Sequence, residues 1–156
     1  MNSTKILIEK TDLAIKLENS KDLNFNLETQ HPYDAGMDVR ACIEYQKILW
    51  PGEVSAIPTG LKIELEDPMW EIQVRSRSGL AAKNSIFTLN SPGTVDYEYR
   101  NEIMVILANF SSTQFVVYPG DRIAQICVRE VPQVYIDYVE KISSTDRGGL
   151  GSTGVK

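Results

Sequence analysis

Hydrophobic and polar residues alternate with a period of two along much of the chain. The clearest cases are DVRACIEY at 38–45 and LKIELE at 61–66, in which every second residue is apolar. EIQVR at 71–75 and VYIDYV at 134–139 follow a similar pattern. Because successive side chains of a strand point to opposite faces, these segments are predicted to be half-buried β-strands.

Turn-forming residues and two uninterrupted apolar runs complete the pattern. IMVILA at 103–108 and IAQICV at 123–128 are expected to be strands buried on both faces. The one helix expected is a turn or two at SGLAAKN, 78–84, and residues 1–19 are expected to add one or two strands. Pro- or Gly-marked breaks, which are typical of strand ends, occur at WPGE 50–53, IPTG 57–60, SPGT 91–94 and YPGD 118–121.

Many short strands with regular turns predict an all-β sandwich, jelly roll or barrel. The segment SSTDRGGLGSTGVK at 143–156 has too many small residues to pack as an element of its own. We therefore expect one domain at 1–143, followed by a flexible glycine-rich C-terminal arm at 144–156. A chain of 156 residues is long enough for one such domain to bury about two-thirds of its unfolded surface.

Composition narrows the classes of function. A formal net charge of -5 argues against general affinity for nucleic acid, which requires a basic face. No apolar run approaches the ~20 residues of a membrane span, and the N-terminus resembles no signal peptide. Cys42 and Cys127 lie in apolar runs, which predicts buried thiols in a reducing, cytoplasmic protein. The single histidine, His31, excludes a multi-histidine metal site.

Two segments could bind phosphate groups. RSRSGLA at 75–81 could form a turn that aims backbone N–H groups and an arginine at an anion, or a polar turn that only caps a short helix. PGDRIAQ at 119–125 fits a turn followed by a strand, in which Asp121 and Arg122 could pair. Gln125 would be the lone amide of an apolar strand. An unpaired buried amide costs about 1–3 kcal/mol, so Gln125 is a candidate functional residue.

The segment NSPGTVDYEYRNEI at 90–103 gathers acidic and aromatic residues behind a Pro-Gly turn. It could be a solvated hairpin, or a pocket with a general base and a stacking platform. The carboxylates are Asp96, Glu98 and Glu102, and the tyrosines are Tyr97 and Tyr99. A straight strand would place Asp96 and Tyr99 on opposite faces, so they can share a pocket only if the chain turns between them.

The glycine-rich stretch GGLGSTG at 148–154 lacks the lysine of a P-loop and does not stand between a strand and a helix. It is therefore either a disordered end or an arm that orders over a ligand.

Taken together and in order, five segments closely resemble the five motifs of the trimeric deoxyuridine triphosphatases (dUTP nucleotidohydrolases, dUTPases). The similarity runs from about residue 30 to the C-terminus. Five motifs in the right order make chance a poor explanation. The segments are AGMDVRA at 35–41, SRSGLA at 76–81, NSPGTVDYEYRNE at 90–102, PGDRIAQI at 119–126 and DRGGLGSTG at 146–154.

This resemblance implies a β jelly roll assembled as a homotrimer, with three active sites at subunit interfaces. It implies hydrolysis of dUTP to dUMP and pyrophosphate, which keeps uracil out of DNA and supplies dUMP for thymidylate synthesis. Mg²⁺ would be held mainly by substrate phosphates and waters, with Asp38 nearby. The partners implied are dUTP and further copies of the chain, with neither nucleic acid nor membrane.

The resemblance also assigns roles to matching residues. Asp96 would orient and deprotonate the attacking water, and Tyr99 would pack under the deoxyribose and leave no room for a 2′-hydroxyl. The uracil pocket would be lined by Asn90, Gly93, Thr94, Val95 and Met104. The phosphates would be held by Arg77, Ser78, Gly79 and Gln125. The arm closing from another subunit would contribute Arg147, Leu150, Gly151, Ser152 and Thr153.

Several positions depart from the family pattern. Ser76 stands where a proline is usual, Glu98 where an aspartate is usual and Asn101 where a glycine is usual. The fifth motif is two residues shorter after Arg147, and Leu150 replaces the phenylalanine that stacks over uracil. We therefore expect a weaker lid and a different reach of Arg147 toward the phosphates.

Two other functions would fit a similar fold. A relative of dCTP deaminase needs a glutamate as general base ten residues after Asp96, where this chain has Ile106. An apolar residue cannot activate water, and the deaminase also lacks the Gly-Ser-Thr tail. A non-catalytic module that binds dUTP or signals to a partner would gain nothing from retaining Asp96 against a triphosphate.

Overall fold

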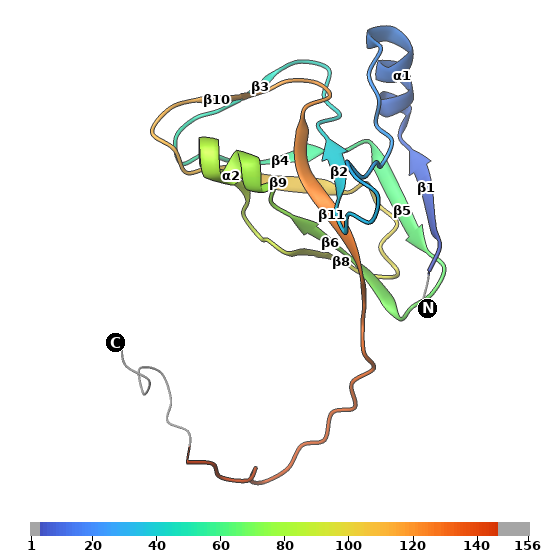
Figure 1. The fold of residues 1–156 in the computed structure, drawn as a ribbon, viewed down its shortest axis with the longest axis vertical. Helices are drawn as coiled ribbons and strands as arrows, with labels where there is room; N and C mark the ends of the chain where they lie inside the picture. The colour runs from blue at the N-terminus through green and yellow to red at the C-terminus, as the bar shows by residue number, and fades with distance from the viewer. Residues whose placement is uncertain (1–3, 147–156) are drawn as a thin grey trace.

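The computed structural model describes residues 4–146, which form a β-rich body with two short helices (Figure 1). The strands are β1 (Ile6–Lys10), β2 (Met37–Arg40), β3 (Lys47–Leu49), β4 (Val54–Pro58), β5 (Leu61–Leu65), β6 (Trp70–Arg75), β7 (Ile86–Thr88), β8 (Gly93–Val95), β9 (Met104–Asn109), β10 (Phe115–Val117) and β11 (Arg122–Glu130). The helices are α1 (Asp12–Lys21) and α2 (Ser78–Asn84).

The strands pair antiparallel in four sheets. The largest has the order β2-β11-β6-β8 and the next has the order β4-β9-β7, and the pairs β1-β5 and β3-β10 complete the set. Buried side chains of the two larger sheets belong to one core, which includes Ile72 and Ile126 from the first and Val105 and Leu107 from the second. The predicted all-β, jelly-roll-like class is confirmed.

Alternation correctly located several strands. In β5, Leu61, Ile63 and Leu65 are buried, whereas Glu64 between them is exposed. Of the four Pro- or Gly-marked breaks, WPGE and YPGD fall between strands, whereas IPTG overlaps the end of β4 and SPGT overlaps the start of β8. The helix expected at 78–84 is α2. The central strand β11 is buried on both faces over residues 123–127, because the neighbours Ile126 and Cys127, whose side chains point to opposite faces, are both buried. The flanking strands β2 and β6 cover its two edges.

The strand β9 is fully buried on one face and only partly buried on the other, where burial of both faces was expected. Val105 and Leu107 point into the core, whereas the side chain of Met104 is 40% exposed. Met104 and Ile106 belong to the outer face of the β4-β9-β7 sheet, together with Ala56 and Pro58, which lie opposite them in register. Ala108 on the same face is buried and Ile106 is half-buried, so this apolar outer face is only partly covered by the described chain.

The helix α1 was not predicted. Thr11 caps its N-terminus, and the Thr11 Oγ1 accepts a hydrogen bond from the Ala14 backbone N–H at 3.3 Å. Only Ala14 and Leu17 are fully buried on α1, and polar residues occupy most of the remaining positions. The apolar stripe is therefore too narrow for the sequence to be recognised as an amphipathic helix. Tertiary packing, rather than a regular apolar pattern, stabilises the helix.

The prediction of a half-buried strand at 134–139 is wrong. After β11, the Val131 backbone N–H still bonds to the Met69 carbonyl at 2.7 Å, but residues 132–146 leave the packed body (Figure 1). The apolar residues there are exposed: Val134 75%, Tyr135 97%, Ile136 73%, Tyr138 97%, Val139 63% and Ile142 80%. The alternation is present, but the described chain offers no surface that covers it.

Both cysteines are buried and free, as predicted. Burial raises the pKa of the Cys42 thiol to about 11, so this thiol is neutral at physiological pH. Among residues 4–146, no helix is both long and apolar enough to cross a membrane.

Candidate functional site

A cavity of about 270 Å³ opens beside the hairpin that links β8 to β9, and we call it the hairpin cavity. All five residues predicted to line the uracil pocket, Asn90, Gly93, Thr94, Val95 and Met104, line this cavity, and so does the predicted sugar-stacking Tyr99. Its lining is Ala56, Val74, Asn90, Gly93, Thr94, Val95, Tyr99, Ile103, Met104 and Ile106. Most of the lining is apolar, with a few polar groups from the 90–94 segment, as is typical of small-ligand pockets.

The cavity wall depends on close backbone packing. Gly93 pairs with Val74 of β6, and a Cβ at Gly93 would lie 3.0 Å from Asn90 Nδ2 and 3.4 Å from Val74 Cβ. The bare glycine backbone therefore lets the Asn90 amide lie flat against β8. The chain reaches β8 through a cis Ser91–Pro92 peptide bond.

The chain turns between Asp96 and Tyr99, because the Tyr99 backbone N–H bonds to the Asp96 carbonyl at 3.0 Å. The turn that would allow Asp96 and Tyr99 to share a pocket is therefore present. Their side chains nevertheless line different cavities. Asp96 is exposed and borders a second space of about 380 Å³, the acidic cavity. Its lining is Pro68, Trp70, Glu71, Asp96, Tyr97, Glu98 and Val131. Within one described chain, the Asp96 carboxylate stands beside the hairpin cavity rather than in it.

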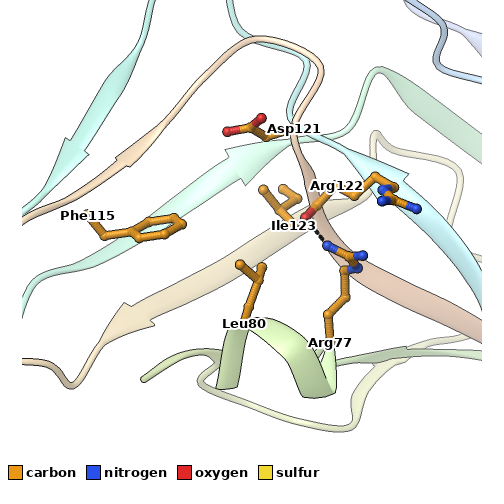
Figure 2. A pocket seen from close by; sticks show the side chains of 6 residues that line it. All are labelled: Arg77, Leu80, Phe115, Asp121, Arg122 and Ile123. Carbon is orange, nitrogen blue, oxygen red and sulfur yellow. Dashed lines mark hydrogen bonds between the residues drawn. The ribbon is translucent and has the colours of Figure 1, made fainter. Parts of the chain in front are cut away.

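Asp38 joins two arginines that come from different motifs. Its Oδ1 lies 3.1 Å from Arg77 Nε and its Oδ2 lies 3.2 Å from Arg122 Nη1, while its side chain is only 13% exposed. Arg77 Nη1 also donates to the Arg122 carbonyl at 2.9 Å (Figure 2). The pair of guanidinium groups neutralises the carboxylate and leaves a surplus positive charge near the start of α2.

The pairing of Asp121 with Arg122 that the sequence suggested does not form. The Asp121 carboxylate accepts the Tyr118 backbone N–H at 2.8 Å and so closes its own turn. Figure 2 shows this carboxylate directed away from the Arg122 guanidinium. Both residues line a space of about 250 Å³, the arginine cavity, with Arg77, Leu80, Phe115 and Ile123.

The side-chain amide of Gln125 has a hydrogen-bond partner, as its place in an apolar strand requires. Its Nε2 donates to the Ser76 carbonyl at 3.0 Å, and its Oε1 lies where a Cβ of residue 36 would be, at 2.0 Å. Only glycine at position 36 therefore allows this arrangement. Gln125 lines a further space of about 380 Å³ with Gln30, Asp34, Ala35, Gly36, Asp38, Arg75 and Cys127.

The remaining predicted phosphate contacts lie at the start of α2. Arg77 is the N-cap residue of α2 and makes no side-chain capping bond, while Ser78 and Gly79 are exposed. The predicted arm residues Arg147, Leu150, Gly151, Ser152 and Thr153 lie outside the described residues. The structure thus groups the uracil and sugar candidates, and it spreads the phosphate candidates and Asp96 over neighbouring cavities.

Sequence reasoning missed one residue of this region and gave another a different role. Arg122 was interpreted as a turn residue, although its place three residues before Gln125 in PGDRIAQ could have marked it. Glu102 was considered only as one of three carboxylates that could supply a general base, whereas its Oε1 accepts the Gly60 backbone N–H at 2.7 Å.

Within residues 4–146, no group of three or more His, Cys, Asp or Glu side chains is arranged to hold a metal ion. Asp38, the carboxylate expected near Mg²⁺, has each oxygen within 3.2 Å of an arginine nitrogen. Mg²⁺ prefers six oxygen ligands and commonly takes several from phosphates and waters. The described residues therefore fit a cation carried by a phosphate ligand better than one caged by protein.

Comparison with known sequences gives a consistent family. The sequence model of the family described as dUTPase matches residues 23–154. A deoxyuridine 5′-triphosphate nucleotidohydrolase from Neorickettsia sennetsu is 48% identical over 124 residues, covering 78% of this chain and 83% of the relative. A protein of the same name from Chlamydia trachomatis serovar L2 is 50% identical over 123 residues, with 77% and 84% covered. The namesake from Alkaliphilus metalliredigens is 46% identical over 144 residues, with 91% and 98% covered.

Solved structures share the fold. The dUTPase of Staphylococcus bacteriophage 80alpha with dUPNHPP superposes with a TM-score of 0.79 at 20% identity, covering 98% of this chain and 100% of that chain. A point mutant of the dUTPase from phage phi11 of S. aureus, described with a structural Mg(II) ion, gives 0.72 at 17% identity, with 90% and 99% covered. With about half of the aligned residues identical to enzymes of this name over more than three quarters of its length, and with all five motifs inside the matched region, the chain belongs to the dUTPase family.

Proposed function

We propose that this protein hydrolyses dUTP to dUMP and pyrophosphate. The observation that carries this proposal is the hairpin cavity, which gathers Asn90, Gly93, Thr94, Val95, Tyr99 and Met104 around one space in a member of the dUTPase family. The rival deamination is disfavoured by the same cavity. Ile106, at the position where a deaminase needs a glutamate, lines its wall and cannot activate water.

The hairpin backbone provides the base selectivity. Hydrogen-bonding groups of residues 93–95 read the donor and acceptor pattern of uracil, which cytosine presents in a different order. The narrow apolar wall formed by Ile106 and Met104 excludes the methyl group of thymine. Tyr99 packs against the deoxyribose and leaves no room for a 2′-hydroxyl.

Asp96 is the general base for the attacking water. Attack at the α-phosphorus develops charge on the phosphate oxygens and on the leaving pyrophosphate. Arg77, with the N–H groups of Ser78 and Gly79 at the start of α2, binds and neutralises these oxygens, and Gln125 holds a further phosphate contact. Mg²⁺, held by the phosphates and waters near Asp38, supplies additional charge neutralisation when it is bound.

The complete site is built by a homotrimer. Two observations support assembly with further copies of the chain. The outer face of the β4-β9-β7 sheet is apolar and partly exposed, with Val54 47%, Leu89 53% and Met104 40% exposed. The exposed apolar residues of 134–142 also need a partner surface. Because Asp96 and the phosphate-binding residues line separate cavities in one chain, neighbouring subunits, together with their C-terminal arms, bring them together.

The reaction has two consequences in the cell. It keeps uracil out of DNA by removing dUTP, and it supplies dUMP for thymidylate synthesis. We place it in the cytoplasm, where two unpaired buried cysteines are stable.

Tyr99→Ala tests the proposal at the hairpin cavity. The unaltered protein is expected to release pyrophosphate from dUTP and hardly at all from UTP. Without the ring, the ratio of kcat/KM for dUTP to that for UTP is expected to fall by about 10-fold to 100-fold, because a 2′-hydroxyl then finds space. Tyr45→Ala is the control, since Tyr45 is 80% exposed and lies outside this cavity. An unchanged ratio in Tyr99→Ala would remove Tyr99 from sugar selection.

A further inference from the structure

Glu102 connects the turn at Gly60 to Tyr99, which lines the hairpin cavity. Its side-chain Oε1 accepts the Gly60 backbone N–H at 2.7 Å, and its backbone carbonyl accepts the Tyr99 hydroxyl at 3.0 Å. The residue is half-buried, so water competes only partly for these bonds. One residue thus touches the buried turn between β4 and β5 with its side chain and the sugar-facing tyrosine with its backbone.

The Gly60 end of this connection is rigid. Gly60 is buried with a φ of +75°, and a Cβ on it would lie 2.7 Å from Ala14 Cβ and 2.8 Å from Cys42 Sγ. Its carbonyl accepts the Thr11 backbone N–H at 2.9 Å, which ties the turn to the start of α1. Any group that is hydrogen-bonded to Gly60 is therefore held in a fixed position relative to the core of the molecule.

The segment next to Glu102 is fixed to the same turn. The Thr59 hydroxyl and backbone N–H both donate to the Ile103 carbonyl, at 2.8 and 3.2 Å, and the Ile103 N–H donates to the Leu61 carbonyl at 2.8 Å. The Ile103 N–H belongs to the same peptide group as the Glu102 carbonyl that accepts the Tyr99 hydroxyl, so this peptide group is held to the turn from its Ile103 side. The side-chain bond of Glu102 to Gly60 is a second anchor, which holds the same peptide group from its Glu102 side.

Tyr99, at the other end of this connection, is more exposed to solvent than Gly60. The Tyr99 side chain is 37% exposed near the tip of the hairpin, and the hydroxyl bond to Glu102 orients its ring against the cavity. We propose that Glu102 is a positioning residue that holds Tyr99 in the orientation required for deoxyribose selection. This inference rests on the proposed dUTP hydrolysis and adds a residue that acts through Tyr99 without touching the nucleotide.

The chain offers a matched control for a purely structural role. Glu53 also bonds a backbone N–H with its carboxylate, at 2.9 Å from the nitrogen of Trp50, but in the β3–β4 turn outside the hairpin cavity. Glu53 also pairs with Lys47 Nζ at 2.8 Å, so Glu53→Ala loses an ion pair as well as the turn bond. If Glu102 only stabilises its turn, Glu102→Ala should likewise lower stability and leave substrate selectivity unchanged.

The test measures kcat and KM for dUTP and for UTP in matched variants. Glu102→Ala is expected to lower the dUTP-to-UTP ratio of kcat/KM roughly 10-fold, whereas Glu53→Ala leaves it unchanged. Glu102→Gln keeps an acceptor oxygen for Gly60 and is expected to restore most of the ratio. Tyr99→Phe, which removes only the hydroxyl, is expected to lose about as much as Glu102→Ala. If Glu102→Ala fails to fold, Glu102→Asp replaces it, because its shorter side chain withdraws from Gly60.

A double substitution separates action through Tyr99 from an independent effect. In a Tyr99→Ala background, Glu102→Ala should cause no further loss of selectivity, because the group that it positions is gone. An equal loss in both backgrounds, or an unchanged ratio in Glu102→Ala, would overturn the inference while the proposed reaction stands. Absence of dUTP turnover in the unaltered protein would instead overturn the proposed function, and the inference with it.

Discussion

Asp96→Asn is expected to lower kcat for dUTP by about 10²–10⁴-fold while the Kd for dUTP changes little. The amide has nearly the shape of the carboxylate, but it cannot accept the proton of the attacking water. Binding is retained because the cavity residues and the phosphate contacts are untouched. Steady-state pyrophosphate release measures kcat, and equilibrium binding of dUTP measures Kd, both with Mg²⁺ present.

Glu98→Gln is the matched control for this substitution. Glu98 is exposed on the same hairpin turn and lines the same acidic cavity as Asp96, so it carries a similar charge in similar surroundings. Near-normal turnover is expected in Glu98→Gln. Retained turnover in Asp96→Asn would show that Asp96 is not the base, whereas equal losses in both variants would show that the local charge matters and not the base role of Asp96.

Gly60→Ala is expected to lower the free energy of unfolding by about 2–5 kcal/mol. The left-handed φ of +75° costs an alanine about 1–2 kcal/mol. The new methyl group would also meet Ala14 Cβ at 2.7 Å and Cys42 Sγ at 2.8 Å, and such overpacking adds about 1–3 kcal/mol. Urea unfolding at one fixed protein concentration measures the change, since assembly makes stability depend on concentration.

Gly52→Ala isolates the backbone part of this effect, so the difference between the two variants gives the cost of overpacking at Gly60. Gly52 has nearly the same φ, +78°, but a Cβ there would meet no atom within 4 Å. We expect only the backbone cost of about 1–2 kcal/mol. Equal losses in the two variants would contradict the tight packing of α1 against the Gly60 turn.

Local sequence patterns predicted the parts of the fold whose partners lie within the described chain. Alternation located β5 and β6, because one face of each strand is covered by the core. The same reasoning failed at 134–139, where the alternation is equally clear but no described surface covers it. It also missed α1, because only Ala14 and Leu17 are fully buried there and a two-residue stripe has no recognisable period.

The candidate site was predictable where its residues are close in sequence. The cavity residues of 90–104 follow from one hairpin, so a motif locates them together. The Asp38 contacts with Arg77 and Arg122 join three motifs through the β2-β11-β6 arrangement, and no spacing in the sequence encodes such a contact. The link from Gly60 through Glu102 to Tyr99 was hidden for the same reason.

The most direct test of dUTP hydrolysis is pyrophosphate release from dUTP, run beside dCTP, dTTP and UTP, with Mg²⁺ and then with excess chelator. We expect rapid release from dUTP alone, suppressed by the chelator. A folded protein that binds dUTP with Mg²⁺ present and releases no pyrophosphate would contradict catalysis, and it would identify the protein as a nucleotide-binding module.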